Sequence, residues 1–313
     1  MRLAVMIEGQ EDVTWPHWQA LAALTERLGF EGLYRSDHYL SVEDFRERGS
    51  LDAWGTICGL GAVTNGIRLG TIVTPASFRH PSVLAKLAVT ADHISGGRIE
   101  LGLGAGWWES EHLRYGFPFL PVRERFDVLE EQLEIITRSW ADEPFSFESA
   151  HYSIDELDAR FKPLGRGRIP IVLGGSGAPR GVALAVRYAD EYNSPHVSPE
   201  QCASIRAALD SACAAAGRDP ATLPLSVMTG FVVGRDEPDV LARGRRLAEW
   251  RREADVDAVE ALLASLRSTW LIGTVESVAA QLRDYESAGV VRVMLQHHLY
   301  EDDEALELMA GLR

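Results

Sequence analysis

The 313-residue chain has few cysteines and no long apolar segment. Its three cysteines, Cys58, Cys202 and Cys213, lack the spacing of a disulfide framework or a zinc site, so we expect reduced thiols buried in helices. No apolar run reaches the roughly 18 residues of a membrane span, and Glu8 interrupts the first apolar stretch. We therefore expect a cytoplasmic protein with no membrane partner.

Basic residues are also scarce. The 31 lysines and arginines stand against 46 aspartates and glutamates, which gives a formal net charge of −15. Because nucleic-acid binding needs clustered positive charge, this balance disfavours a nucleic-acid partner. Hydrophobic residues make up 46% of the chain and charged residues 25%, which is ordinary for a globular protein with a large core. Extensive disorder is therefore excluded.

Short apolar or β-branched segments alternate with amphipathic helical patterns along almost the whole chain. The predicted strands cover residues 3–8, 30–35, 67–75, 99–104, 169–175, 189–193, 225–234 and 291–296. An irregular acidic and aromatic stretch at 141–167 is too long for an ordinary loop and predicts an insertion between strands 4 and 5. Residues 236–268 predict extra helices after strand 7, charged on one side.

The pattern predicts an α/β protein with a single (β/α)8 TIM barrel domain over residues 1–313. Eight strands that are nearly continuous apolar runs are typical of a closed parallel sheet buried on both faces. The alternative is a doubly wound open sheet, whose glycine fingerprint should follow the first strand. The sequence there is Glu8-Gly9-Gln10-Glu11, which favours the barrel.

Function in such a barrel lies at the carboxyl ends of the strands. The polar residues expected at that rim include Glu8, Ser36, Asp37, His38, Thr74, Arg79, His80, Asn193, Ser194, His196, Gln296, His297 and His298. In Asp37-His38, an imidazole beside a carboxylate can donate or accept a proton near neutral pH. The structural alternative is that Asp37 caps the following loop and His38 is polar packing.

Two glycine-rich segments follow predicted strands. IVLGGSGAPR combines a strand, a glycine turn and the start of a helix, which would point backbone N–H groups at one spot. Such a segment can bind a phosphate group, or it can be only a tight connection between strand and helix. No lysine of the kind that hydrolyses nucleoside triphosphates follows it. GLGAGWW would let a flat group approach the backbone, or would serve close strand packing with core tryptophans. The histidines lack the paired spacing of barrel metal hydrolases, so no metal is expected.

Together these motifs resemble the luciferase-like monooxygenase superfamily, specifically its branch of oxidoreductases that use the deazaflavin coenzyme F420. The matching segments, in the family's order, are GFEGLYRSDHY, IRLGTIVTPASFRHPSVLAK, DHISGGRIELGLGAGWWESEHLRYGFPF, RFDVLEEQLEII, IPIVLGGSG followed by ALAVRYADEYN, and IGTVESVAAQLRDYESAGVVRVMLQ. They extend from the first residues to about residue 300. The resemblance implies a barrel with flavin or deazaflavin at the rim.

The resemblance also implies roles for particular residues. His38 and Asp37 would be the catalytic pair beside the reactive ring, with His38 as acid, base or anchor for the deazaflavin hydroxyl. Ile72-Val73 corresponds to a non-prolyl cis bond against the ring. The implied cofactor-binding residues are Asp37, His38, Ile72, Val73, Thr74, Gly104, Ala105, Gly106, Gly174, Gly175, Ser176, Gly177 and Asn193, with the glycine turn at 174–177 on the phosphate.

One departure from the family bears on the substrate. Sugar-phosphate dehydrogenases of this branch carry a carboxylate directly after the Gly-x-Gly of strand four, where this chain has Trp107. Sugar phosphates are therefore disfavoured, and an apolar, aromatic pocket is expected, with core packing as a comparable interpretation. The residues expected to contact the substrate are Trp107, His80, Glu111 and His297.

The leading hypothesis is hydride transfer between F420 and a small organic substrate. An alternative is a two-component monooxygenase that uses reduced FMN, oxygen and a separate reductase. A third possibility is a non-redox barrel, either a metal-dependent hydrolase or a phosphate-binding carrier without catalysis. F420 has a glutamate tail, which would need basic residues, and the chain has lysine only at positions 86 and 162. The candidates for the tail are Arg79, Arg166, Arg168 and Arg180. The resemblance also implies a homodimer.

Overall fold

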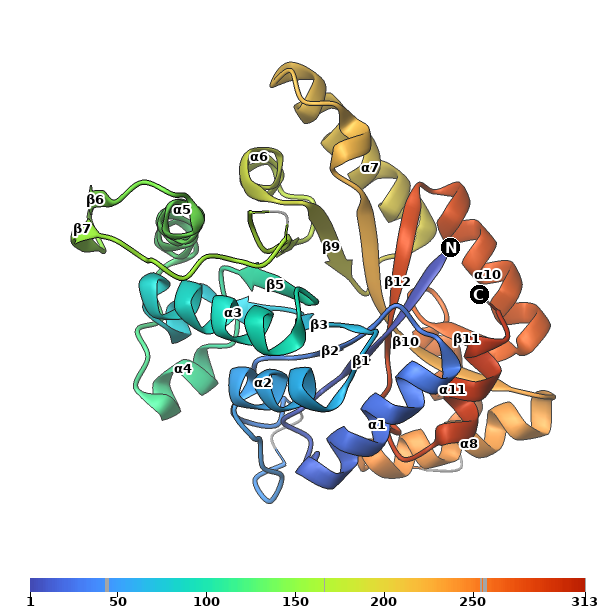
Figure 1. Cartoon of the computed structure of the whole chain (residues 1–313). Coiled ribbons are helices and arrows are strands. Elements are labelled where there is room, and N and C mark those ends of the chain that lie inside the picture. The colour runs from blue at the N-terminus through green and yellow to red at the C-terminus, as the bar shows by residue number, and fades with distance from the viewer. Residues whose placement is uncertain (43–44, 166, 254, 256–257, 313) are drawn as a thin grey trace.

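The computed structural model describes residues 1–42, 45–165, 167–253, 255 and 258–312, and its centre is a ring of parallel strands (Figure 1). In this part of the chain, eight strands pair in the order β1-β2-β3-β5-β8-β9-β10-β12, and β12 returns to β1. They are β1 (Arg2–Ile7), β2 (Gly32–Arg35), β3 (Arg68–Thr71), β5 (Ile99–Gly104), β8 (Ile171–Gly174), β9 (Glu191–Pro195), β10 (Leu225–Gly234) and β12 (Val290–Gln296). The predicted (β/α)8 barrel is confirmed. Arg166 lies outside the described residues.

Helices follow the strands and cover the outside of the ring (Figure 1). They are α1 (Trp15–Leu28), α2 (Ala53–Val63), α3 (Pro81–Ser95), α4 (Glu109–Tyr115), α5 (Val122–Trp140), α6 (Pro179–Tyr188), α7 (Pro199–Ala215), α8 (Glu237–Arg251), α9 (Val259–Leu266), α10 (Val275–Ser287) and α11 (Asp303–Ala310). Helices α8 and α9 are the extra helices predicted after strand 7. No helix in the described ranges has the length and apolar character needed to cross a membrane.

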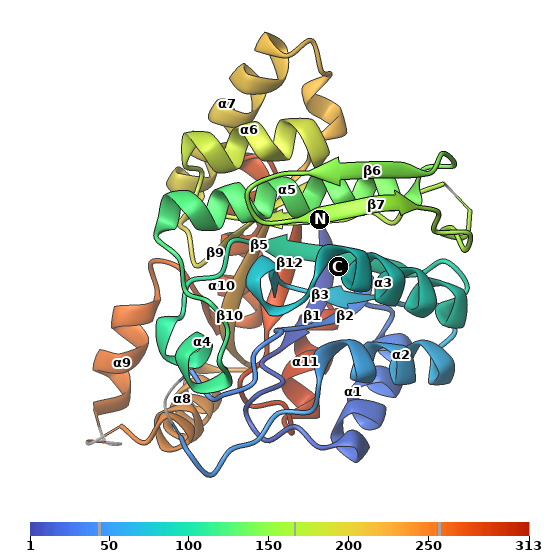
Figure 2. The same ribbon diagram turned by 90° about the vertical axis from the view of Figure 1, so that its left-hand side faces the viewer.

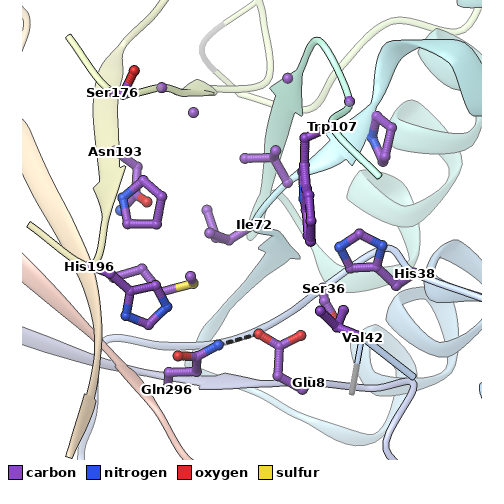
Figure 3. Close-up of a pocket in the computed structure, with 18 of the residues that line it drawn as sticks. Glu8, Ser36, His38, Val42, Ile72, Trp107, Ser176, Asn193, His196 and Gln296 are labelled. Atoms are coloured by element: carbon purple, nitrogen blue, oxygen red, sulfur yellow. Dashed lines mark hydrogen bonds between the residues drawn. The ribbon is translucent and has the colours of Figure 1, made fainter. Parts of the chain in front are cut away.

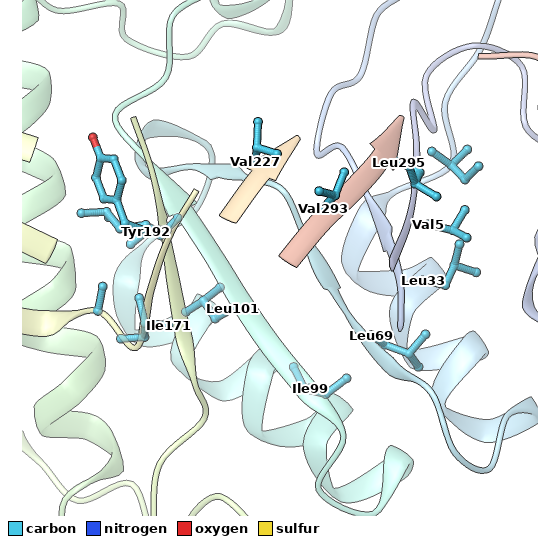
Figure 4. Packing of buried hydrophobic residues seen from close by; sticks show 14 of the residues in the cluster. Val5, Leu33, Leu69, Ile99, Leu101, Ile171, Tyr192, Val227, Val293 and Leu295 are labelled. Atoms are coloured by element: carbon cyan, nitrogen blue, oxygen red, sulfur yellow. The ribbon is translucent and has the colours of Figure 1, made fainter. Parts of the chain in front are cut away.

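Side chains alternate between the two faces of each barrel strand, as the period of two requires. In β1, Leu3, Val5 and Ile7 belong to the large apolar cluster between strands and helices, whereas Ala4 and Met6 belong to a small cluster inside the ring. Figure 4 labels members of the larger cluster on neighbouring strands, among them Val5, Leu33, Leu69, Leu101, Val227 and Val293. This alternation decides which residues beyond the strand ends face the barrel mouth.

Charged residues fill the amino-terminal part of the barrel interior. Arg292 of β12 is 1% exposed and donates hydrogen bonds to Glu191 at 2.6 Å, to Glu100 at 2.9 Å and to the Tyr34 hydroxyl at 2.8 Å. Arg68 also donates to Glu100. Because a buried charge is tolerated only when it is paired, these contacts form one network. The network closes the barrel at the end opposite to the predicted site.

The insertion predicted between strands 4 and 5 is present, but it is not irregular. It contains an antiparallel hairpin of β6 (Phe145–Glu148) and β7 (Ser153–Leu157), which lies beside α5 on the outside of the molecule (Figure 2). The strand predicted at 67–75 is divided into β3 and the short β4 (Thr74–Pro75), which pairs with β5. One further strand, β11 (Leu271–Thr274), was not predicted and pairs with the carboxyl half of β10. The cysteines are free, and Cys58 is partly exposed while the other two are buried.

Candidate active site

A cavity of about 700 Å³ opens at the carboxyl ends of the barrel strands (Figure 3). The predicted site residues that line it are His38, Ile72, Val73, Gly104, Ala105, Gly106, Trp107, Gly174, Gly175, Ser176 and Asn193. These residues come from segments that lie up to 155 positions apart in the sequence, from 38 to 193. The barrel therefore brings both glycine-rich segments and the Asp37-His38 loop to one mouth.

His38 stands on the cavity wall beside Trp107 (Figure 3). Its ring is held from behind by a buried carboxylate. Its Nδ1 lies 2.8 Å from Oε2 of Glu111, which is fully buried. The other oxygen of Glu111 accepts hydrogen bonds from the backbone N–H groups of Tyr39 and Leu40. Glu111 thus fixes both the loop and the imidazole, and it leaves Nε2 of His38 for a ligand.

The pKa of His38 is raised above its usual value. Burial by itself lowers it, but the hydrogen bond and negative charge of Glu111, together with the charges of Glu8 and Asp37, outweigh burial. His38 therefore keeps a proton to a higher pH than a free histidine, as a proton donor in a neutral solution must.

Glu8 forms a second polar point at the cavity wall. Its two carboxylate oxygens each accept one side-chain amide, from Gln10 at 2.7 Å and from Gln296 (Figure 3). Burial raises its pKa, but the positive charge of His38 and these amide hydrogen bonds outweigh burial, so the pKa is lowered. Glu8 is therefore an anion in the cavity at neutral pH.

Asp37 does not face the cavity. Its side chain is 1% exposed and pairs with Arg79 at 2.5 Å and with the Thr74 hydroxyl at 2.7 Å, behind the cavity wall. The expected contact of Asp37 and Thr74 with the cofactor is corrected accordingly, because both residues point away from the barrel axis. Their hydrogen bonds instead tie the loop that carries His38 to the loop after β3.

The glycines at the ends of β5 and β8 make room for Val73. The Ile72-Val73 peptide bond is cis, as the family resemblance implied. A Cβ atom at Gly104 would lie 2.7 Å from one methyl group of Val73, and one at Gly174 would lie 3.0 Å from the other. A side chain at Gly104 would therefore displace Val73 from its place in the cavity wall, and one at Gly174 would press against it.

The glycine turn at residues 174–177 connects β8 to the start of α6. Gly174, Gly175, Ser176, Ala178 and Gly181 line the cavity there. The first N–H groups of a helix have no partner within the helix and form an anion site.

Two amides of the turn are used internally, since Gly175 donates to the Asn193 carbonyl at 3.0 Å and Gly177 to the Tyr192 hydroxyl at 2.9 Å. Gly177 does not line the cavity and serves the turn, with φ of 81°. The expected phosphate contact of Gly177 is corrected to this structural role.

Three of the four residues expected to contact a substrate lie elsewhere. Glu111 is buried behind His38. His80 is exposed and pairs with Ser82 at the start of α3. His297 is buried outside the barrel, where its ring stacks on Phe231 at 5.2 Å. Trp107 does line the cavity, and it is 61% exposed.

Three of the arginines considered for a cofactor tail lie within the described residues, and all three are paired with carboxylates. Arg79 binds Asp37 and Asp52. Arg168 precedes β8, at the opposite end of the barrel, and pairs with Asp190. Arg180, at the start of α6, pairs with Asp127 and is the one nearest the cavity wall, over the ring of Phe126. Of the three that the structure describes, Arg180 therefore remains the candidate for an anionic tail.

Several cavity residues had been given no role. Glu8, Gln296 and His298 were expected at the rim without a role, whereas Gln10, Met228, Trp250, Leu266 and Trp270 were not predicted there. Strand alternation identifies His298 and Gln296, because they share the inward face of β12 with Met294. Within the described ranges, no group of three or more histidine, cysteine, aspartate or glutamate residues is arranged to hold a metal.

Comparison with known proteins places this chain in a family. The sequence profile of the luciferase-like monooxygenase family matches residues 1–292. The chain is 31% identical over 271 residues to the F420-dependent hydroxymycolic acid dehydrogenase of Mycobacterium tuberculosis, which covers 82% of this chain and 71% of that protein. It is 32% identical over 202 residues to the F420-dependent glucose-6-phosphate dehydrogenase of Microbacterium testaceum, covering 62% of this chain and 57% of that protein.

A solved structure has the same fold. The F420-dependent secondary alcohol dehydrogenase in complex with an F420-acetone adduct superposes with a TM-score of 0.81 at 18% identity and covers 98% of each chain. Because the family profile covers most of the sequence, the chain belongs to the luciferase-like monooxygenase family. It is an oxidoreductase of the F420 or flavin type.

Proposed function

We propose that this protein transfers a hydride between coenzyme F420 and a small organic substrate, with His38 as the proton donor or acceptor. The observation that carries the proposal is the environment of His38: Glu111 holds Nδ1, the pKa is raised, and the ring faces a cavity with a glycine-lined wall. The relatives that use F420 support this choice of cofactor.

The cavity suits a flat ring with a phosphate-bearing tail. Val73 and the side-chain-free backbone of Gly104 and Gly174 give an apolar surface that a planar ring can approach. The start of α6 offers backbone N–H groups beyond Ser176. When bound there, F420 would supply or accept the hydride.

The chain's own residues would orient the reactants and handle the proton. His38 Nε2 would give a proton to a substrate oxygen during reduction, or take one during oxidation. Glu111 would hold the imidazole in one orientation throughout. Val73 and Trp107 would exclude water from the reacting face.

F420 and FMN share a tricyclic ring and a phosphate-bearing chain, so a titration must separate them. We expect oxidised and reduced F420 to bind the purified protein more tightly than FMN, as measured by the change in absorbance on mixing. Tighter binding of reduced FMN, with oxygen consumption, would instead support the two-component monooxygenase. If neither cofactor binds, the proposed function is wrong.

Adding a methyl group at Gly104 tests the cofactor surface. In Gly104→Ala the new Cβ would lie 2.7 Å from Val73, so Val73 must shift. We expect F420 affinity to fall about 10-fold or more and stability to fall by about 1–3 kcal/mol. Gly55→Ala in α2 is the matched control, since its Cβ would make ordinary contact at 3.5 Å, and it should leave F420 binding unchanged. Equal F420 affinity in both variants would contradict this assignment.

The expected homodimer, and a separate reductase if FMN is used, remain predictions. Sedimentation of the purified protein would measure the oligomeric state directly.

A further inference from the structure

The cavity has a second end, across from the glycine-rich segments, with a different character. It is built from β10, from the carboxyl ends of α8 and α9, and from the residues just before β11 and just after β12: Met228, Trp250, Leu266, Trp270 and His298. This inference rests on the proposed function, because it assigns the glycine-lined end to the cofactor and asks what the aromatic end binds.

Flat rings are stacked along this end. Trp270 is parallel to His298, with ring centroids 5.0 Å apart and an angle of 2°, and nearly parallel to His196 at 6.3 Å and 21°. Trp250 meets His298 at 5.1 Å. A Cβ at Gly230 would lie 2.4 Å from the Trp270 indole, so the backbone of β10 is shaped to admit that ring. Such a wall favours flat, apolar ligands.

The wall also carries polar atoms without partners. Neither ring nitrogen of His298 nor the amide oxygen of Gln296 has a hydrogen-bond partner among the described residues, although these atoms are buried. Leaving such a group unpaired costs about 1–3 kcal/mol. A ligand carbonyl or hydroxyl oxygen would recover this cost at the N–H of His298, whereas the Gln296 oxygen is an acceptor and needs a hydroxyl donor. His196 lies at the same end with φ of 50°, a conformation that is unfavourable for a residue other than glycine.

Charge at this end disfavours an anionic ligand. Burial lowers the pKa of His298 to about 4, which the charge of Glu8 opposes and those of His196 and Arg251 reinforce, so His298 is neutral at pH 7. Arg251 pairs with Glu253, and Glu8 is an anion. A neutral imidazole has one donor and one acceptor nitrogen, so it can bind a carbonyl or a hydroxyl group.

We propose that the aromatic end binds a neutral, ring-bearing organic substrate against Trp270, and that His298 hydrogen-bonds the oxygen that this substrate carries. His298 is thus a specificity-determining residue. The substrate class is a neutral cyclic ketone, phenol or alcohol, and we expect sugar phosphates and other anions to bind more weakly.

Three probes of similar size test the proposal: acetophenone, ethylbenzene, which lacks the oxygen, and benzoate, which is an anion. Binding is measured by calorimetry, with and without saturating F420, and by the fluorescence of the cavity tryptophans. We expect wild-type protein to bind acetophenone at least about 10-fold more tightly than either other probe, which is roughly one hydrogen bond. Equal binding of acetophenone and ethylbenzene, preference for benzoate, or no binding of any probe would overturn the proposal.

The variant His298→Phe keeps a flat ring beside Trp270 and removes both nitrogens. We expect it to bind acetophenone about 10-fold more weakly while ethylbenzene binding is unchanged. His297→Phe is the matched control. The ring of His297, the residue next to His298, lies outside the barrel, so this substitution should change the binding of neither acetophenone nor ethylbenzene. An unchanged ratio of the two affinities in His298→Phe would overturn the proposal.

The binding of the three probes to the wild-type protein tests the proposed substrate site even if His298→Phe does not fold. If F420 fails to bind but acetophenone is preferred, the proposed function fails while this binding site stands. If F420 binds but acetophenone is not preferred, only the present inference fails.

Discussion

Replacing His38 with asparagine is expected to lower turnover about 10²- to 10⁴-fold, the range that a positioned proton donor contributes. Asparagine can still hydrogen-bond to Glu111, so the loop should keep its place, but it cannot transfer a proton. The measurement is the rate at which acetophenone oxidises reduced F420, followed by absorbance. His80→Asn, at an exposed histidine outside the cavity, should retain the full rate.

The pH dependence provides an independent test. Because the pKa of His38 is raised, the protonated form persists above the usual range, and the rate of reduction should fall as pH rises through this raised value. Glu111→Gln keeps an oxygen for the backbone amides of the loop but removes the negative charge. The pKa of His38 and the alkaline limb should then move to lower pH, which an NMR titration of the imidazole also reports. Unchanged activity in His38→Asn, or an unmoved limb in Glu111→Gln, would contradict the role given to His38.

Most of the fold could be predicted from the sequence because it depends on local periodicity. Near-continuous apolar runs indicated buried parallel strands, and α5 begins and ends where its amphipathic pattern does, at Val122 and Trp140. The hairpin β6–β7 was missed because its strands have only four and five residues, so the alternation in FSFE is too short to identify a strand. Its position outside the barrel explains why few apolar residues were needed there.

Errors in the predicted site follow from the alternation of side chains. The sequence correctly placed pairs of neighbouring residues at the carboxyl ends of strands. Because side chains alternate, only one residue of each pair can face the barrel axis. His38 faces the cavity while Asp37 faces outward, and His298 faces the cavity while His297 faces outward. Extending the inward face of β12 from Met294 through position 296 to position 298 would have selected the correct histidine.

Other contacts could not be predicted from local patterns. Glu111 reaches His38 across 73 positions of sequence, and no periodicity relates a residue of α4 to the loop after β2. Trp250 lies in α8 and Trp270 follows α9, in a stretch whose charged side suggested a partner surface or a solvated face rather than a cavity wall. Their place in the cavity wall results from how α8 and α9 pack on β10 and β11.

Replacing Arg292 with methionine is expected to give the largest loss of stability, about 3–5 kcal/mol in the free energy of unfolding. Methionine fills similar space but leaves Glu100 and Glu191 as two buried carboxylates facing each other without their shared cation. Arg235→Met is the matched control, since that side chain is 64% exposed in its pair with Asp239, and such pairs contribute about 0–1 kcal/mol.

The loss of stability caused by Arg292→Met should be smaller at acidic pH than at neutral pH. In the wild type, burial raises the pKa of Glu100, but the charges of Arg292 and Arg68 outweigh burial and lower it. A carboxyl group with a lowered folded-state pKa adds stability above its unfolded pKa and loses that contribution as the pH falls. Without Arg292, burial and mutual repulsion would raise the pKa of both carboxyl groups, so the variant would gain from protonation. The loss measured by urea denaturation should therefore be largest near pH 7.5 and smaller near pH 5, and a loss no greater than that of Arg235→Met would show that the network does not support the barrel.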